Sequence, residues 1–459
     1  MFKKIFALVL VIVMIVGMVG CGDKNKLPEY ENHEFEISAF WAPYDISEKG
    51  LQQYKDAGFN TLAMINHSLD KDSDNQFYLG SNRTMTALKN CKKVGLKAIL
   101  NYNDWIATWA ENDENYYSET PFSQYDVYGE YKDIIVGIHI VDEPKQEHID
   151  RFSDKAFIDD FKKTYPNAKY IVNLIPEYAS ASAYDFDTYE DMWDIYNKEI
   201  LSKFETNRIS SLDFYYFYAR DNGKRKVGIM KNFDQFAKFA KNNNTSQTFI
   251  MQSSVTNEFD STLSEGDIRL QANMSMAFGA DAMQYYCYSV PFSINEDDEK
   301  EYMYDYCIMT QDDKPSDVYN HVKKVNAEAQ ALAPAILSYK WQEATAVPGI
   351  SNVMQVGEYY DMSDGKFEKT KHYKNVQGTE NVVMSRFTSD KYGEAYMLVN
   401  FAERELDNTV DLIMKECETL AIYGGVGFNG TPKIVELDKD GKCQINLAYG
   451  EGVFIVPLK

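Results

Sequence analysis

The chain has little histidine and a deficit of basic charge. Its 459 residues include six histidines and 47 lysines and arginines, against 70 aspartates and glutamates, which gives a formal net charge of −23. A strongly acidic chain repels polyanions, so the sequence predicts no nucleic acid partner. The histidines are scattered and no Ser-His-Asp elbow is present. Neither acyl transfer nor a histidine-built metal centre is therefore favoured.

Cysteine is also scarce, and its spacing matches no known framework. Apart from Cys21 there are five, an odd number without paired metal-ligand spacing: Cys91, Cys287, Cys307, Cys417 and Cys443. Cys417 and Cys443 could pair, but solitary buried thiols are the favoured interpretation. The sequence thus predicts no zinc site and no other cofactor.

The N-terminus has the pattern of an export signal. Lys3 and Lys4 precede an apolar run over residues 5–16, and small residues then lead to Cys21. This segment resembles a bacterial lipoprotein signal, although Met18 stands where leucine is usual. The resemblance implies that residues 1–20 are removed and that the thiol of Cys21 takes up lipid, with residues 21–34 as a linker. The expected location is the cell surface or the periplasmic side of the cytoplasmic membrane. An ordinary cleaved signal or an uncleaved anchor would also export the chain.

Residues 35–337 repeat one unit eight times: a short apolar strand, a polar loop rich in aromatics, and an amphipathic helix. Asp45 and Glu48 are expected to form a capping box, Gly95 to end the second helix, and the last helix to run from after Pro315 towards Leu332. No glycine-rich phosphate fingerprint follows the first strand, which argues against a doubly wound nucleotide binder. Eight such units favour a closed α/β barrel of the (β/α)8, or TIM, type. The expected strands are Phe35–Phe40, Phe59–Ile65, Leu96–Tyr102, Val136–Val141, Lys169–Leu174, Ile209–Phe214, Thr248–Gln252 and Ala282–Tyr288.

Residues 338–459 change to short β-like runs, which predict a small C-terminal all-β domain of the sandwich type. Residues 349–378 are polar and mixed, and are expected to form an early hairpin or a long loop. The expected strands are Asn381–Phe387, Glu394–Phe401, Asn408–Ile413, Thr419–Tyr423, Lys433–Leu437 and Gly452–Pro457.

The candidate site follows from the barrel, because barrel active sites lie at the C-terminal ends of the strands. Carboxylates, amides and aromatic rings dominate at these positions. His139 lies inside a strand and is expected to be a hydrogen-bonded interior residue. The candidate residues are Trp41, Asn66, His67, Asn101, Asp104, Trp105, Asp142, Glu143, Glu177, Asp213, Tyr215, Gln252 and Tyr286.

These residue types suit the hydrolysis of a glycosidic bond. The leaving oxygen needs a proton, and a second carboxylate is needed on the other side of the sugar. Aromatic side chains offer flat apolar faces to sugar rings, with OH or NH groups for the hydroxyls. The predicted substrate is therefore an extracellular oligo- or polysaccharide.

The sequence Asp142-Glu143-Pro144 closes the fourth strand and resembles the Asn/Asp-Glu-Pro motif of clan A retaining glycoside hydrolases, a group that includes family 42 β-galactosidases. The resemblance covers residues 35–337 and the trailing β domain. It implies that Glu143 is the general acid/base and that Asp142 bonds the sugar near its 2-hydroxyl. We expect Glu143 to lie in a partly desolvated pocket that keeps it protonated near neutrality.

The chain departs from that family at strand seven, where the family has its nucleophilic glutamate and this chain has Gln252. Glu258 on the following loop and Asp213 at the end of strand six are equal candidates for the second catalytic carboxylate, and Glu177 is a further one. The separation of the two carboxyl groups decides between retention and inversion, so the stereochemical outcome stays open.

Two other functions fit the same residues. A surface lipoprotein that binds glycans without cleaving them would explain Gln252. A metal-assisted barrel hydrolase could use Asp142, Asp213 and Glu177 as oxygen ligands.

Overall fold

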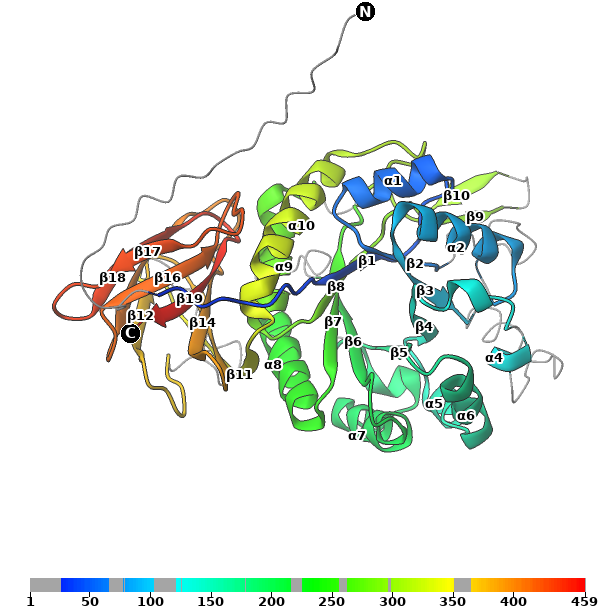
Figure 1. Cartoon of the computed structure of the whole chain (residues 1–459), viewed down its shortest axis with the longest axis horizontal. Coiled ribbons are helices and arrows are strands. Elements are labelled where there is room, and N and C mark those ends of the chain that lie inside the picture. Colours follow the sequence, from blue (N-terminus) through cyan, green and yellow to red (C-terminus); the bar gives the residue numbers. More distant parts are fainter. Residues whose placement is uncertain are drawn as a thin grey trace, which may run out of the picture.

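The computed structural model comprises a barrel followed by a β domain (Figure 1). It describes residues 26–65, 77, 79–102, 121–124, 126–177, 179–215, 225–255, 262–295, 299–350 and 365–458, without the side chains of 225–228. The expectations for the signal segment, Cys21, Asn66, His67, Asp104, Trp105 and Glu258 lie outside these residues. Within the described part of the chain, no helix is long and apolar enough to cross a membrane.

The first eight strands form one parallel sheet in the order β1-β8-β7-β6-β5-β4-β3-β2. Asn60 closes the seam between the two outer strands, because its backbone N–H donates to Ile37 O at 3.1 Å and its side-chain Oδ1 accepts from Ile37 N at 2.9 Å. All eight strand predictions and the barrel are confirmed. The strands are β1 (Glu36–Ala39), β2 (Thr61–Ala63), β3 (Lys97–Asn101), β4 (Ile135–Asp142), β5 (Lys169–Leu174), β6 (Ile209–Phe214), β7 (Ser246–Gln252) and β8 (Ala282–Tyr286).

Helices cover the outside of the barrel: α1 (Glu48–Asp56), α2 (Asn82–Val94), α4 (Pro121–Gln124), α5 (Gln146–Phe152), α6 (Lys155–Thr164), α7 (Tyr189–Glu199), α8 (Arg225–Asn243), α9 (Glu265–Ala277) and α10 (Asp317–Ile336), with 3-10 turns η2 (Gly129–Tyr131), η3 (Ala181–Tyr184) and η4 (Leu201–Lys203). Gly95 ends α2 in the left-handed region with φ of 74°, as predicted. The expected capping box of Asp45 and Glu48 is wrong. Ser47 caps α1 by accepting from Gly50 N, and Asp45 instead accepts from Ser47 N. The helix begins at Glu48, so the N-cap position falls on Ser47 and Asp45 stands two residues too early.

The barrel interior is apolar in its middle and polar towards the C-terminal ends of the strands. Phe40, Ile99, Ile171, Ile209 and Ile250 pack together inside the ring. The residues that follow on the same faces of β3, β5, β6 and β7 are polar and at most 4% exposed: Asn101, Asn173, Ser211, Asp213 and Gln252. Residues two positions apart on a strand point to the same face, so these polar side chains form the next layer beyond the apolar one. That layer lies at the end of the barrel that carries the predicted site.

A hairpin of β9 (Phe292–Ile294) and β10 (Lys300–Tyr302) follows the barrel strands. The C-terminal domain then packs a six-stranded sheet, β11-β13-β14-β19-β16-β17, over a three-stranded sheet, β12-β15-β18, around one apolar core. The six predicted strands are confirmed, whereas β11, β12 and β18 were not predicted. The strands are β11 (Lys340–Val347), β12 (Tyr373–Gly378), β13 (Val382–Ser389), β14 (Gly393–Asn400), β15 (Asn408–Met414), β16 (Thr419–Gly424), β17 (Lys433–Glu436), β18 (Lys442–Leu447) and β19 (Gly452–Leu458).

A buried ionic contact joins the β domain to α9, on the side of the barrel away from α4 (Figure 1). The carboxylate of Asp267 is 0% exposed. It accepts from Arg404 Nε at 2.9 Å and from Tyr449 OH at 3.0 Å. Asp267 also caps α9 by accepting from Ser264 N at 2.9 Å. One carboxylate thus ties the barrel helix to two loops of the β domain.

Replacing Asp267 with Asn is expected to lower the free energy of unfolding by roughly 2–3 kcal/mol, because hydrogen bonds to a charged group are lost in a buried site. Urea denaturation would measure this loss. Asp317→Asn is the matched control, since Asp317 lies in the first turn of α10 but is exposed. Equal losses in the two variants would contradict the assigned role of the ionic contact.

Candidate active site

The end of β4 bends, and this bend sets the direction of the two acids that follow. A register shift between His139 and Val141 inserts one extra residue against β5, so that Asp142 pairs with Asn173. A bulge of this kind re-aims the side chains beyond it. Glu143 then has a φ of 44°, in the left-handed region that non-glycine residues rarely occupy. Its backbone N–H is held by Asn173 O at 3.0 Å.

Asn173 on β5 connects the neighbouring strands on either side. Its Nδ2 donates to Asp142 Oδ1 at 2.9 Å and to Asp213 Oδ1 at 3.4 Å, and its Oδ1 accepts from Ser211 Oγ at 3.0 Å. The ladder aligns Asn173 with Asp142 on β4 and with Ser211 on β6. Parallel register therefore brings three polar side chains from three strands into one layer. The serine hydroxyl fixes which end of the amide faces the acids.

Asp213, near the end of β6, is 1% exposed and lies close enough to Glu143 for the two charges to interact. Burial first, and then the negative charge of Glu143, raise the pKa of Asp213 to about 8, while hydrogen bonds from Tyr215 and Asn173 act in the opposite direction. Near neutral pH, Asp213 is therefore protonated.

Tyrosines surround this pair of acids. Tyr184, in η3, donates its OH to Glu143 Oε2 at 2.7 Å. The ring of Tyr215 lies 5.0 Å from that of Tyr286, centroid to centroid, and Tyr286 OH lies 3.3 Å from Tyr304 OH. Desolvation by burial raises the pKa of Tyr184, so the phenol stays a hydrogen-bond donor at neutral pH. The acids thus face aromatic surface that also carries hydroxyl groups.

Four other candidates lie at strand ends but are engaged elsewhere. Glu177 forms an ion pair with Lys231 of α8, and its backbone N–H donates to Asn232 Oδ1 at 2.7 Å. Gln252 donates to Ser254 O at 3.1 Å and is 4% exposed. Trp41 packs in the barrel interior, and the buried Asn101 donates to Phe77 O at 3.3 Å. These side chains help to hold the barrel end together.

His139 lies in the barrel interior, as predicted, with its ring 5.5 Å from that of Phe40 in an edge-on arrangement. The expected hydrogen bond is wrong for the described residues, where neither ring nitrogen has a partner. Burial lowers the pKa of His139 to about 4, so it is neutral at physiological pH.

Three residues of the site were not predicted from the sequence: Asn173, Ser211 and Tyr184. Asn173 and Ser211 are polar residues that lie on predicted strands, in the same layer as predicted acids, and that pattern could have identified them. Tyr184 follows β5 by a loop and carries no local signal. Among the described residues, no group of three or more His, Cys, Asp or Glu is arranged to hold a metal ion. Asp142, Asp213 and Glu177 are thus not brought together as a ligand set.

The sequence matches no protein-family model, and no curated protein matches it at a significant level. Among solved structures, a family 39 glycoside hydrolase from Bacteroides cellulosilyticus WH2 is 11% identical, with 94% of this chain and 83% of that chain covered and a TM-score of 0.49. A β-galactosidase from Rahnella sp. R3 is 12% identical, with 69% and 58% covered and a TM-score of 0.48. A GH30 endoxylanase from Clostridium papyrosolvens C71 is 11% identical, with 94% and 98% covered and a TM-score of 0.42. Likeness at this level says nothing about what this chain acts on.

Proposed function

We propose that this chain is an exported glycoside hydrolase that cleaves O-glycosidic bonds of oligo- or polysaccharides. The observation that carries the proposal is the pair of interacting carboxyl groups, Glu143 and Asp213, at the C-terminal end of the barrel. One acid of the pair is partly exposed and the other is buried and protonated. Such a pair can retain one proton at neutral pH and present it to a leaving oxygen.

Glu143 is the group that meets the substrate, because it is only partly buried and Tyr184 orients its carboxylate. Glu143 donates the proton to the glycosidic oxygen and later takes one from water. Asp213 is 1% exposed, so it acts as the proton partner of Glu143. Asp142, oriented by Asn173, is placed to accept a hydrogen bond from a sugar hydroxyl. Glu258 stays the candidate for the carboxylate on the other side of the sugar.

The alternative is a surface protein that binds glycans without cleaving them. Gln252 favours it, because an amide cannot act as a nucleophile at the end of β7. The buried carboxyl of Asp213 favours hydrolysis, because a site that only binds sugars has no need of a desolvated carboxyl that interacts with a second acid. Metal-assisted hydrolysis is less favoured, since Glu177 is engaged by Lys231.

Export and membrane attachment are part of the proposal and rest on the N-terminal sequence. Lipid on Cys21 would hold the protein at the outer surface of the cytoplasmic membrane. Metabolic labelling with a fatty acid analogue, compared between the natural chain and Cys21→Ser, tests this. Equal labelling of the two proteins would contradict the lipid anchor.

The test of the function is release of chromophore from a panel of aryl α- and β-glycosides by a soluble form that begins at Gly22. The panel spans hexosides, pentosides and 6-deoxyhexosides. We expect hydrolysis of at least one member. No hydrolysis of any member, together with measurable binding of the same sugars, would support the glycan-binding alternative.

Replacing Tyr184 with Phe is expected to lower kcat/KM by about tenfold or more, because a hydrogen bond to a carboxylate contributes about 1.5–3 kcal/mol. The loss should fall on kcat, since the bond orients Glu143. Tyr392→Phe is the control, because its OH bonds Glu29 O far from the barrel end. A purely KM effect in Tyr184→Phe would contradict this positioning role.

A further inference from the structure

The strap, residues 26–35, leads into the barrel and lies against the boundary between the barrel and the β domain. Figure 1 shows it in dark blue, running from the β domain to β1. The ring of Tyr30 lies edge-on to three other tyrosine rings, with centroid distances of 6.2 Å to Tyr339, 5.0 Å to Tyr392 and 5.7 Å to Tyr423. Its OH also lies 3.2 Å from Tyr339 OH. Tyr339 links α10 to β11, and the other two belong to the β domain, so one ring of the strap contacts both sides of the boundary.

Hydrogen bonds to the backbone fix the strap towards both of its ends. Tyr392 OH donates to Glu29 O at 2.7 Å. At the other end, Gln330 of α10 brackets Phe35, because its Oε1 accepts from Phe35 N at 3.1 Å and its Nε2 donates to Phe35 O at 2.8 Å. Asn60 Nδ2 donates to the same oxygen at 2.7 Å. The strap is therefore part of the folded body.

The docked strap shortens the tether between the folded body and a lipid on Cys21. A chain spans at most about 3.5 Å per residue, so residues 22–25 reach at most about 14 Å whatever their conformation. Without docking, residues 22–34 could reach about 45 Å. A globular chain of this size has a radius of gyration of about 22 Å. The longer tether would let any face of the protein turn to a bilayer, whereas the shorter one keeps the surface around the start of the strap next to it.

The strap meets the barrel at the end opposite Glu143. Phe35 directly precedes β1, and Asn60, which bonds it, directly precedes β2, so both lie at the N-terminal ends of their strands. Glu143 directly follows β4, at its C-terminal end. The strands of this barrel are parallel, so the two positions lie at opposite ends of it. The predicted site is thus separated from the strap by the length of the barrel.

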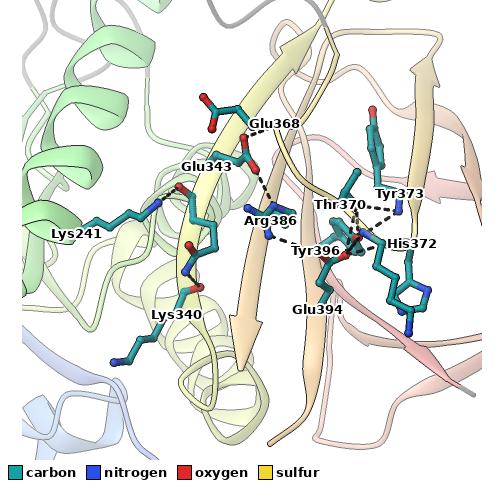
Figure 2. Close-up of polar contacts among 12 residues, drawn as sticks. Lys241, Lys340, Glu343, Glu368, Thr370, His372, Tyr373, Arg386, Glu394 and Tyr396 are labelled. Carbon is teal, nitrogen blue, oxygen red and sulfur yellow. Dashed lines mark hydrogen bonds and ion pairs between the residues drawn. The ribbon is translucent and has the colours of Figure 1, made fainter. Parts of the chain in front are cut away.

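The β domain, against which the strap packs, is itself held to the barrel. Lys241 of the barrel helix α8 donates its Nζ to a backbone oxygen of β11 at 2.9 Å (Figure 2). Within the β domain, Arg386 Nε donates to Glu343 Oε1 at 2.7 Å, and Arg386 also pairs with Glu394 at 3.6 Å. These contacts run from α8 across β11 and β13 to β14, beside the turn that carries Tyr392. An orientation imposed on the strap is therefore passed to the barrel.

We propose that the strap and a lipid on Cys21 hold this protein on a bilayer by the surface around residue 26, with the barrel end that carries Glu143 directed away from the lipid. The proposal rests on the lipid anchor proposed above. Leu27, which is 37% exposed, lies at the start of the strap and faces the headgroups. The acidic chain is repelled by anionic lipid, which opposes lying flat on the membrane. If the chain is a hydrolase, its site then meets saccharides of the surrounding medium and not glycolipids of the same membrane.

The test is energy transfer from a fluorophore on the protein to rhodamine-labelled lipid in phosphatidylcholine vesicles. The chain begins at Cys21, which is coupled to a maleimide phospholipid, so the result does not depend on natural lipidation. It carries Cys417→Ser, because Cys417 is the one described cysteine that is not buried. Asp390 or Glu147, both exposed, is replaced by p-azidophenylalanine, to which the fluorophore is attached.

Asp390 lies in the turn beside the strap, and Glu147 lies just beyond the end of β4. The eight residues of β4, at about 3.3 Å each and a tilt of roughly 36°, cover about 20 Å of the barrel axis. Energy transfer falls steeply with distance, so we expect its rate to be about tenfold lower from Glu147 than from Asp390 over this added length.

Two variants should bring the transfer rates from the two positions together. Tyr30→Ser combined with Tyr392→Phe removes the ring contacts and the bond to Glu29 O. A flexible glycine-serine insertion after Asn25 keeps these contacts but lengthens the tether. His33→Ser is the matched control, because His33 lies on the strap outside the tyrosine cluster and its loss should leave the difference intact.

A difference between the two positions that both variants remove and the control keeps supports the proposal. Equal transfer from both positions in the natural sequence, or a difference that neither variant changes, overturns it. Hydrolysis of aryl glycosides and labelling by fatty acid are measured separately, so failure of the orientation leaves both of those results intact.

Discussion

Glu143→Gln is expected to reduce hydrolysis of the best aryl glycoside by about 10²–10⁴-fold, the range that general acid catalysis usually contributes. Glutamine has nearly the same shape and still accepts a hydrogen bond from Tyr184, so the site should keep its geometry. What is lost is the proton that Glu143 gives to the leaving oxygen. Circular dichroism and thermal denaturation would show that the variant remains folded.

The leaving group gives a sharper measurement. A dinitrophenyl leaving group departs without a proton, whereas an alkyl alcohol needs one. If Glu143 is the acid, the loss in Glu143→Gln should be smallest for dinitrophenyl glycosides and largest for alkyl glycosides, at the cleavage step. Glu147→Gln is the control, because Glu147 is four residues away and 68% exposed. An equal loss for every leaving group would indicate a nucleophilic role for Glu143, and unimpaired hydrolysis would refute its participation.

The fold was largely predictable because its signals are local. Each barrel strand is a short apolar run, and the confirmed αL residue Gly95 ends a helix where only glycine is favoured. The missed strand β18 alternates buried Cys443, Ile445 and Leu447 with polar residues, but it is short and directly follows Gly441 and a charged segment, which weakens the local signal. In β11 the first residue is exposed and the middle is half-buried, so the strand shows no clear alternation.

The site was predictable only in part, because its geometry depends on pairing between strands. The position of Glu143 at the end of β4 follows from strand order. The bulge that pairs Asp142 with Asn173 depends on register, which no local pattern encodes. The proton affinity of Asp213 depends on burial and on a charge from another strand. Both are properties of the assembled barrel.

Asp213→Asn is expected to move the alkaline limb of the kcat/KM profile to lower pH by about one unit or more, so that activity at pH 8 falls by about tenfold. In the natural pair, ionising both acids would give the site two interacting negative charges, one of them on the buried Asp213, so the last proton is retained up to a pH of about 8. Asparagine is neutral at every pH and removes this repulsion. The remaining acid then loses its proton earlier. An alkaline limb unchanged by Asp213→Asn would contradict proton sharing.

The same substitution should also change how the free energy of unfolding depends on pH. The variant should gain stability relative to the natural chain as pH rises, whereas its activity at high pH should fall. The pKa of Asp213 is about 8 in the folded chain, against roughly 3.9 for an unfolded aspartate. Between these values the folded state binds a proton that the unfolded state does not, so the free energy of unfolding of the natural chain falls as pH rises. Asp213→Asn has no such titration. Its stability relative to the natural chain should therefore increase from pH 5 to pH 8, on the order of a few kcal/mol. Urea denaturation at these two pH values measures this, with the exposed Asp150→Asn as the control. A difference in stability that does not grow with pH would mean that Asp213 is ionised in the folded protein, and Glu143 would then need another source for its proton.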